Sequence, residues 1–148
     1  MSSEVNKTLS RRLVEEAWNQ GKIEVVDETL ADDFVHHDPT APERCNRGDY
    51  KQWIAVSRVA FPDLQITVDD ELVDDEQIVT RWTVRGTHQG NLVEPTGTIP
   101  PTGRQIKITG ITIARYANGK LVEDWQEGDT LGFMMQLGVL PAPAQASG

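Results

Sequence analysis

The chain has 148 residues, of which 14 are Lys or Arg and 23 are Asp or Glu, so its formal net charge at pH 7 is -9. An acidic surface repels phosphate backbones and anionic lipids, and we therefore expect no nucleic-acid partner and no membrane partner. The length suits one domain with a sizeable core, which we assign to residues 1–140. Residues 141–148 (PAPAQASG) are predicted to form a disordered tail.

Two features of the sequence bear on the compartment. Cys45 is the only cysteine, which excludes an internal disulfide and a cysteine-rich zinc site and is ordinary in a reducing compartment. Residues 1–12 contain no apolar run of the kind found in signal peptides, and nowhere do about 18 apolar residues follow one another. We therefore expect a cytoplasmic protein.

Three helices are predicted before any strand. Apolar residues recur at helical spacing over residues 4–20, and a shorter repeat predicts a second helix over residues 23–30. The third helix, over residues 50–61, is predicted to have Asp49 as its N-cap and to end at Pro62.

Strands and a closing helix are predicted for the rest of the chain. Alternation of apolar and polar residues predicts strands over residues 64–69 and 77–88, and the acidic segment 69–76 between them reads as a solvated turn. Residues 105–129 predict a hairpin, because Asn118-Gly119 tolerates the positive φ angles of a two-residue turn.

The order of these elements indicates the fold class. Asp129 can cap a last helix that stops at Gly138. Helices first and strands afterwards favour an α+β fold with a largely antiparallel sheet over alternating βαβ units.

The second strand of the hairpin carries a carboxylate on each face. Glu123 shares one face with Trp125, whereas Asp124 shares the other with Gln126, because side chains alternate along a strand. One acid must therefore point inward, where burial would raise its pKa. We expect Asp124 and Gln126 on the floor of a site; the alternative is that Asp124 faces water or pairs with Arg115.

Segments spread over nearly the whole chain resemble one known family. They are EAWNQG (16–21), FVHHDP (34–39), FPDL (61–64), GTHQG (86–90), PPTG (100–103), NGK (118–120), VEDW (122–125) and QLG (136–138). Together they resemble the SnoaL-like polyketide cyclases, or ester cyclases, of the nuclear-transport-factor-2-like superfamily.

The resemblance implies a fold, an assembly and a ligand. The fold is a curved, mostly antiparallel sheet that wraps as a cone around an apolar cavity closed by the N-terminal helices. The assembly is a homodimer or a higher homo-oligomer through the convex face of the sheet, and the ligand is a small hydrophobic or polycyclic molecule. Cyclases of this family close a ring by intramolecular aldol condensation without a metal or cofactor, so we expect neither.

The same resemblance places the proton carriers of the family on residues that carry no proton near neutral pH. The aspartate position falls on Gln126 and the histidine position falls on Thr112, and neither side chain can replace the group it stands for. An offset of two residues would instead put Asp124 at the aspartate position. The resemblance thus predicts the fold and the cavity and leaves the reaction open.

The candidate catalytic residues are His88, Asp124, Gln126 and Asp129. His88 could orient a carbonyl or move a proton, unless a backbone carbonyl satisfies it at the end of its strand. Asp124 and Asp129 are candidate acid/base groups, although Asp129 could simply cap a helix. Gln126 would donate a hydrogen bond.

The candidate ligand-binding residues are mostly aromatic. They are His37, Tyr50, Trp53, Phe61, Trp82, Thr112 and Met134. Aromatic residues at this spacing also form ordinary core. His37 is expected at the cavity entrance, and a metal bound by the His36-His37-Asp38 run would need a further ligand such as His88 or Glu123, so we expect no metal site.

Three functions fit the sequence. The first is a cofactor-free enzyme of cyclase or isomerase type that transfers a proton on a small apolar carbonyl or ester compound. The alternative is a non-catalytic binding protein for a small hydrophobic ligand, and the third is a structural dimerisation module. The superfamily also contains epoxide hydrolases and dehydratases, so the fold alone does not choose.

Overall fold

The computed structural model describes residues 3–40, 45–94 and 97–140. The predicted tail, residues 141–148, lies outside the described residues. The helices are α1 (Ser3–Arg12), its π-helical continuation η1 (Leu13–Trp18), α2 (Glu24–Thr29), α3 (Arg47–Ala60) and α4 (Thr130–Leu137). The strands are β1 (Leu30–His37), β2 (Gln65–Val73), β3 (Gln77–Thr87), β4 (Leu92–Glu94), β5 (Gly97–Ile99), β6 (Gln105–Ala117) and β7 (Lys120–Gly128).

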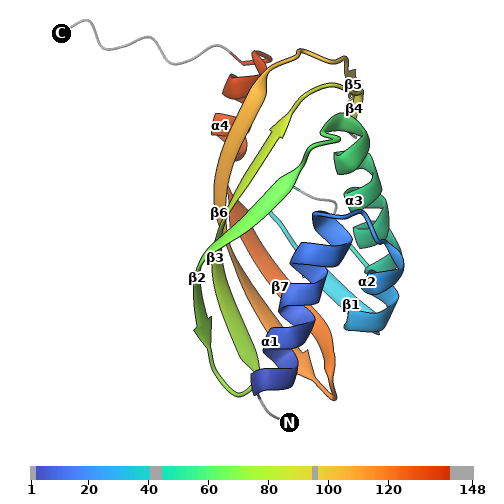
Figure 1. The fold of residues 1–148 in the computed structure, drawn as a ribbon, viewed down its shortest axis with the longest axis vertical. Coiled ribbons are helices and arrows are strands. Elements are labelled where there is room, and N and C mark those ends of the chain that lie inside the picture. The colour runs from blue at the N-terminus through green and yellow to red at the C-terminus, as the bar shows by residue number, and fades with distance from the viewer. Residues whose placement is uncertain (1–2, 41–44, 95–96, 141–148) are drawn as a thin grey trace, which may run out of the picture.

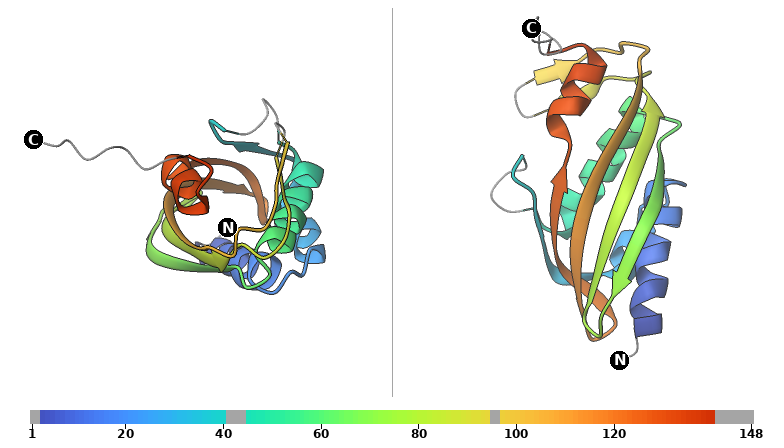
Figure 2. Two further views of the ribbon diagram at one scale, coloured as in Figure 1. Left: turned by 90° about the horizontal axis from the view of Figure 1, so that it is seen from above. Right: turned by 90° about the vertical axis from the view of Figure 1, so that its left-hand side faces the viewer.

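A curved sheet organises the molecule. Its strand order is β1-β7-β6-β3-β2, and every neighbouring pair is antiparallel except β1 and β7. The strands bend into an open ring, with α1, α2 and α3 covering the open side and α4 at one end (Figures 1 and 2). The predicted α+β fold, a curved and mostly antiparallel sheet closed by N-terminal helices, is confirmed.

The β6–β7 hairpin forms as its turn sequence predicts. Asn118 has φ 53° and Gly119 has φ 74°, which is the left-handed conformation that both central residues of a type I′ turn require. Beyond the turn, the register shifts between Arg115 and Tyr116, which marks a β-bulge. The bulge changes which residues of β7 share a face, so Leu121 and Asp124 are both buried although their numbers differ in parity.

Three local predictions are wrong. The three helices do not all precede the strands, because β1 lies between α2 and α3. The N-cap of α3 is Asn46, whose side chain accepts from the backbone of Asp49, while Asp49 completes a capping box from the third helical position. The acidic segment 69–76 is not a turn over its whole length, because β2 continues to Val73 with its carboxylates exposed. Water solvates one face of an edge strand, so charge alone does not end the strand.

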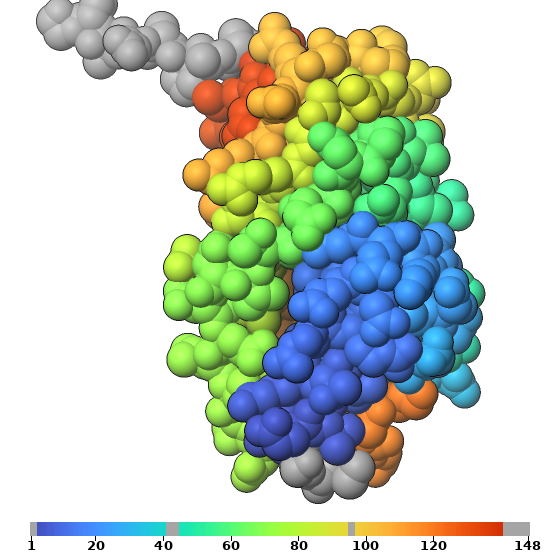
Figure 3. Space-filling view, in the orientation of Figure 1, coloured from blue at the N-terminus to red at the C-terminus, as the bar shows by residue number. Residues whose placement is uncertain are grey.

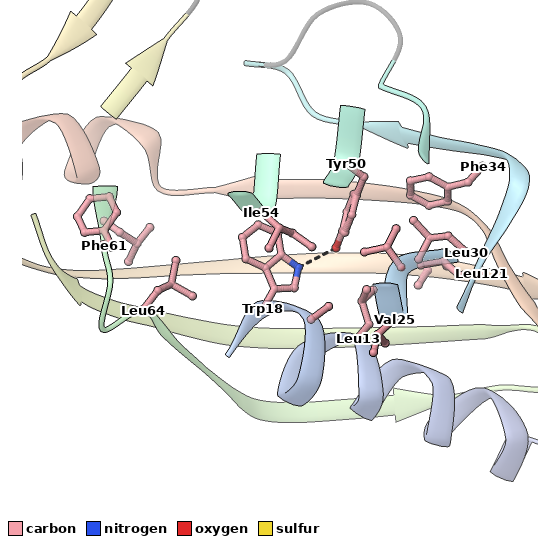
Figure 4. Packing of buried hydrophobic residues seen from close by; sticks show 14 of the residues in the cluster. Leu13, Trp18, Val25, Leu30, Phe34, Tyr50, Ile54, Phe61, Leu64 and Leu121 are labelled. Carbon is pink, nitrogen blue, oxygen red and sulfur yellow. Dashed lines mark hydrogen bonds between the residues drawn. The ribbon is translucent and has the colours of Figure 1, made fainter. Parts of the chain in front are cut away.

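The core lies between the helices and the concave face of the sheet. Phe34 of β1 and Ile54 of α3 are fully enclosed, and Trp18 of η1 donates its indole N–H to the Tyr50 hydroxyl at 2.9 Å (Figure 4). The side chain of Asn19 exchanges two hydrogen bonds with the backbone of Ile66. These bonds connect the end of η1 to β2, and the N-terminal helices cover the side of the ring next to β2 (Figure 3).

Candidate functional site

A cavity of about 710 Å³ lies inside the ring of strands and helices. Most of its lining is apolar, and its aromatic residues come from both helices and strands. They are Trp18, Tyr50, Trp53, Phe61, Trp82, Tyr116 and Phe133. A cavity of this size and character suits a small, largely hydrophobic molecule.

A histidine and a carboxylate meet in the wall of this cavity. His36 of β1 is 3% exposed and Asp124 of β7 is 4% exposed, and their Nδ1 and Oδ1 atoms are 2.5 Å apart. The two residues are register partners on parallel strands, so the backbone holds them side by side. An ionised carboxylate only accepts hydrogen bonds, so Nδ1–H of His36 donates to Asp124, which leaves Nε2 as the nitrogen available to a ligand.

Two opposing effects act on the pKa of Asp124, and burial is the larger. Burial raises the pKa of Asp124, and the hydrogen bond from His36 acts in the opposite direction. The rings of Trp53 and Tyr50 flank the imidazole of His36 at centroid distances of 5.0 and 5.8 Å. These contacts hold the imidazole in one orientation and keep water away from it.

A second carboxylate lies on the other side of the imidazole. Asp38 Oδ2 is 4.0 Å from His36 Nε2 and accepts a hydrogen bond from the amide of Gln126 at 3.1 Å. Thr40 donates to the other oxygen of Asp38 from both its backbone and its hydroxyl. Asp38 is thus fixed close to the ligand-facing nitrogen. Gln126 donates here to a side chain of the protein, and its predicted hydrogen bond to a ligand stays a prediction.

His36 and Asp38 were not among the residues predicted from the sequence. The signal that could have found them is the alternation around Phe34, because this residue must be buried and residues two and four positions later share its face. His37, one of the two histidines that the sequence favoured, points to the outer face. Its ring stacks on Trp125 and its Nε2 is 2.7 Å from Glu123, so it does not line the cavity.

His88 is also separate from the cavity lining. It is completely buried against Phe61, and its Nδ1 accepts hydrogen bonds from the hydroxyl and the backbone N–H of Thr102. Burial lowers its pKa. These contacts indicate a structural role for His88, which connects residues 100–103 (PPTG) to the end of β3.

The remaining candidates line the cavity in different ways. Thr112 accepts a hydrogen bond from the Trp82 indole at 2.9 Å, and Met134 contributes apolar surface from α4. Asp129 caps α4 by accepting from the backbone of Gly132 at 2.9 Å, as the sequence predicts, and its side chain also reaches the lining.

Cys45 lines the cavity but is not a reactive thiol. Burial raises the pKa of the Cys45 thiol to about 11, so it is not a thiolate near neutral pH.

Within residues 3–40, 45–94 and 97–140, no group of three or more His, Cys, Asp or Glu side chains is placed to hold a metal ion. None of the helices in that part of the chain is long and apolar enough to span a bilayer.

Comparison with known proteins gives one consistent result. A family model described as SnoaL-like polyketide cyclase matches residues 8–137. Among solved structures, AclR from Streptomyces galilaeus, a candidate hydroxylase, is 28% identical with a TM-score of 0.81, and 98% of this chain and 87% of that chain are covered.

Two further structures are similar over most of their length. TsrD from Streptomyces laurentii is 28% identical with a TM-score of 0.82, covering 95% of this chain and 99% of that chain. IdmH from Streptomyces antibioticus, a candidate polyketide cyclase, is 31% identical with a TM-score of 0.74, covering 89% and 97%. A search of curated proteins finds no match. This chain belongs to the SnoaL-like polyketide cyclase family and has its nuclear-transport-factor-2-like fold.

Proposed function

We propose that the protein is a cofactor-free enzyme that moves a proton on a small apolar carbonyl or ester compound, in a reaction of cyclase or isomerase type. The observation that carries this proposal is the His36–Asp124 pair in the wall of the 710 Å³ cavity. A buried imidazole that a carboxylate orients is the usual means of proton transfer near neutral pH.

The chemistry assigns a role to each group. His36 Nε2 takes a proton from the carbon next to the carbonyl of the ligand, and the C–H electron pair becomes the enolate. The enolate then attacks a second carbonyl of the same molecule, which closes a ring, and the alkoxide so formed takes the proton back from His36. Alternatively, the enolate takes that proton at another carbon, which moves a double bond. Asp124 and Asp38 lie on opposite sides of the imidazole, so they stabilise its positive charge while it holds the proton.

The test measures removal of a proton from carbon. β-Tetralone, a neutral bicyclic ketone, is incubated with the protein in D2O, and deuterium uptake next to the carbonyl is followed by NMR. We expect the wild-type protein to speed this exchange, His36→Gln to abolish the effect, and Asp33→Asn, which changes an exposed carboxylate on the same strand, to leave it intact. Binding of the ketone without any exchange would instead support the non-catalytic binding protein.

We further propose that the outer face of the sheet forms a homodimer interface. Ile111, Ile113 and Trp125 are 48%, 39% and 38% exposed on adjacent strands, and such a patch suits contact with a second copy of the chain. Ile113→Glu should yield a monomer, because a carboxylate cannot be buried there without a partner. Light scattering coupled to gel filtration measures this, with Val59→Glu, at a 62% exposed position of α3, as the control. An unchanged mass for Ile113→Glu would contradict the proposal.

A further inference from the structure

Trp82 occupies space that the absence of a side chain at Gly110 leaves open. Its indole lies over Gly110 of β6, where a Cβ would come within 2.3 Å of the ring, and beside Gly128 of β7, where a Cβ would be 3.5 Å away. Only the Cβ at Gly110 would collide with the ring, because 3.5 Å is an ordinary contact, so the missing side chain of Gly110 makes the room that the indole occupies.

The position of the ring fixes the direction of one hydrogen bond. Trp82 Nε1–H can only donate, and it donates to Thr112 Oγ1 at 2.9 Å. The hydroxyl oxygen is thus used as an acceptor, and its own proton remains to be donated. Among the residues that the structure describes, Thr112 makes no other side-chain hydrogen bond, although it lines the cavity.

Thr112 is close to the proposed proton-transfer groups. It is the register partner of Gln126, and Gln126 in turn donates to Asp38, whose carboxylate faces His36 Nε2. The carboxylates of Asp38 and Asp124 accept hydrogen bonds, so this side of the cavity presents acceptors around His36 and a hydroxyl donor at Thr112. A ligand that matches both has a hydrogen-bond acceptor next to an acidic C–H group, which is the pattern of an enolisable ketone.

We propose that Thr112 is the hydrogen-bond donor to the carbonyl oxygen of the ligand, and that Trp82 is the positioning residue that keeps its proton directed into the cavity. The ligand class rests on the proposed function. As the carbon next to the carbonyl loses its proton, negative charge develops on the carbonyl oxygen, and a fixed donor then stabilises it more than it stabilises the neutral ketone.

The test measures the infrared stretching frequency of the carbonyl group of a bound ketone. The infrared band of carbonyl-labelled β-tetralone bound to the protein is expected at lower frequency than in an apolar solvent. Thr112→Val, which keeps the shape and removes the hydroxyl, should return the band toward the solvent value and weaken binding about fivefold, as loss of one neutral hydrogen bond does. Thr112→Ser should retain the wild-type band, and Trp82→Phe should broaden it because the hydroxyl is no longer held.

The matched control is Thr80→Val. Thr80 is the register partner of Thr112 on β3 and lies in the same lining, but no tryptophan donates to it, so its removal should leave the band unchanged. A bound-ketone band at the solvent value, an identical band in Thr112→Val, or no binding of the ketone would overturn the proposal. A shifted band without deuterium exchange would support this role of Thr112 and contradict the enzyme, whereas exchange without a shifted band would contradict only the role of Thr112.

Discussion

Replacement of Asp124 by Asn is expected to slow proton exchange on β-tetralone by about 100-fold or more, the range in which single acid/base groups contribute. The amide has nearly the same shape but no charge, so it neither holds Nδ1–H of His36 as firmly nor stabilises the imidazolium. Rates are measured by deuterium uptake, with Asp33→Asn as the matched change at an exposed position. A rate within a factor of two or so of the wild-type rate would remove Asp124 from the proposed machinery.

The pH dependence of the free energy of unfolding should also differ between the wild-type protein and Asp124→Asn. Because burial raises the pKa of Asp124 above its ordinary 3.8, the folded protein binds this proton more tightly than the unfolded chain does. This contribution to the free energy of unfolding is complete below the ordinary pKa and is lost as pH rises through the raised value. Urea unfolding across the acid range should show this loss in the wild-type protein and a weaker one in Asp124→Asn.

Replacement of Gly90 by Ala is expected to lower the free energy of unfolding by about 3 kcal/mol. A Cβ at this position would come within 2.0 Å of the backbone carbonyl oxygen of Val59 in α3. No side-chain rotation relieves a clash with backbone, so the segment after β3 must move away from the end of α3, where Gly90 N–H now donates to Ala60. A loss of this size corresponds to a fall in melting temperature of roughly 10 °C for a domain of this length.

The control for Gly90→Ala is Gly128→Ala. A Cβ at Gly128 would have its nearest neighbour, the Trp82 ring, at 3.5 Å, an ordinary contact, so we expect a change within about 1 kcal/mol of the wild-type stability. Calorimetric melting of both variants measures the difference. Equal melting temperatures would show that the segment around Gly90 is not packed against α3 as described.

Much of the fold could be predicted because it depends on local signals. The Asn118-Gly119 turn, the Asp129 cap and the stop at Gly138 each act over a few residues, and the structure has all three. The end of β2 could not be predicted in this way. Its acidic residues can lie in a strand because β3 supplies the backbone hydrogen-bond partners and water solvates their side chains on one face of the sheet.

The candidate site was predicted only in part, because its histidine depends on the pairing of two strands that are far apart in the sequence. Asp124 was expected to point inward, and the bulge at Arg115 places it there together with Leu121. His36 is brought to Asp124 by parallel pairing of β1 with β7, a pairing that no local pattern specifies. Without that pairing, the sequence favoured His37 and His88 over His36.

The central claim is that His36 presents Nε2 to the ligand while Asp124 holds Nδ1–H. The most direct measurement is a long-range proton–nitrogen NMR spectrum of the histidine side chains at mildly alkaline pH, with and without β-tetralone, assigned through His36→Gln. The account predicts the His36 proton on Nδ1, a shift of the Nε2 signal when the ketone binds, and loss of that tautomer in Asp124→Asn. A His36 proton on Nε2, or a His36 ring that bound ketone leaves unchanged, would contradict the account.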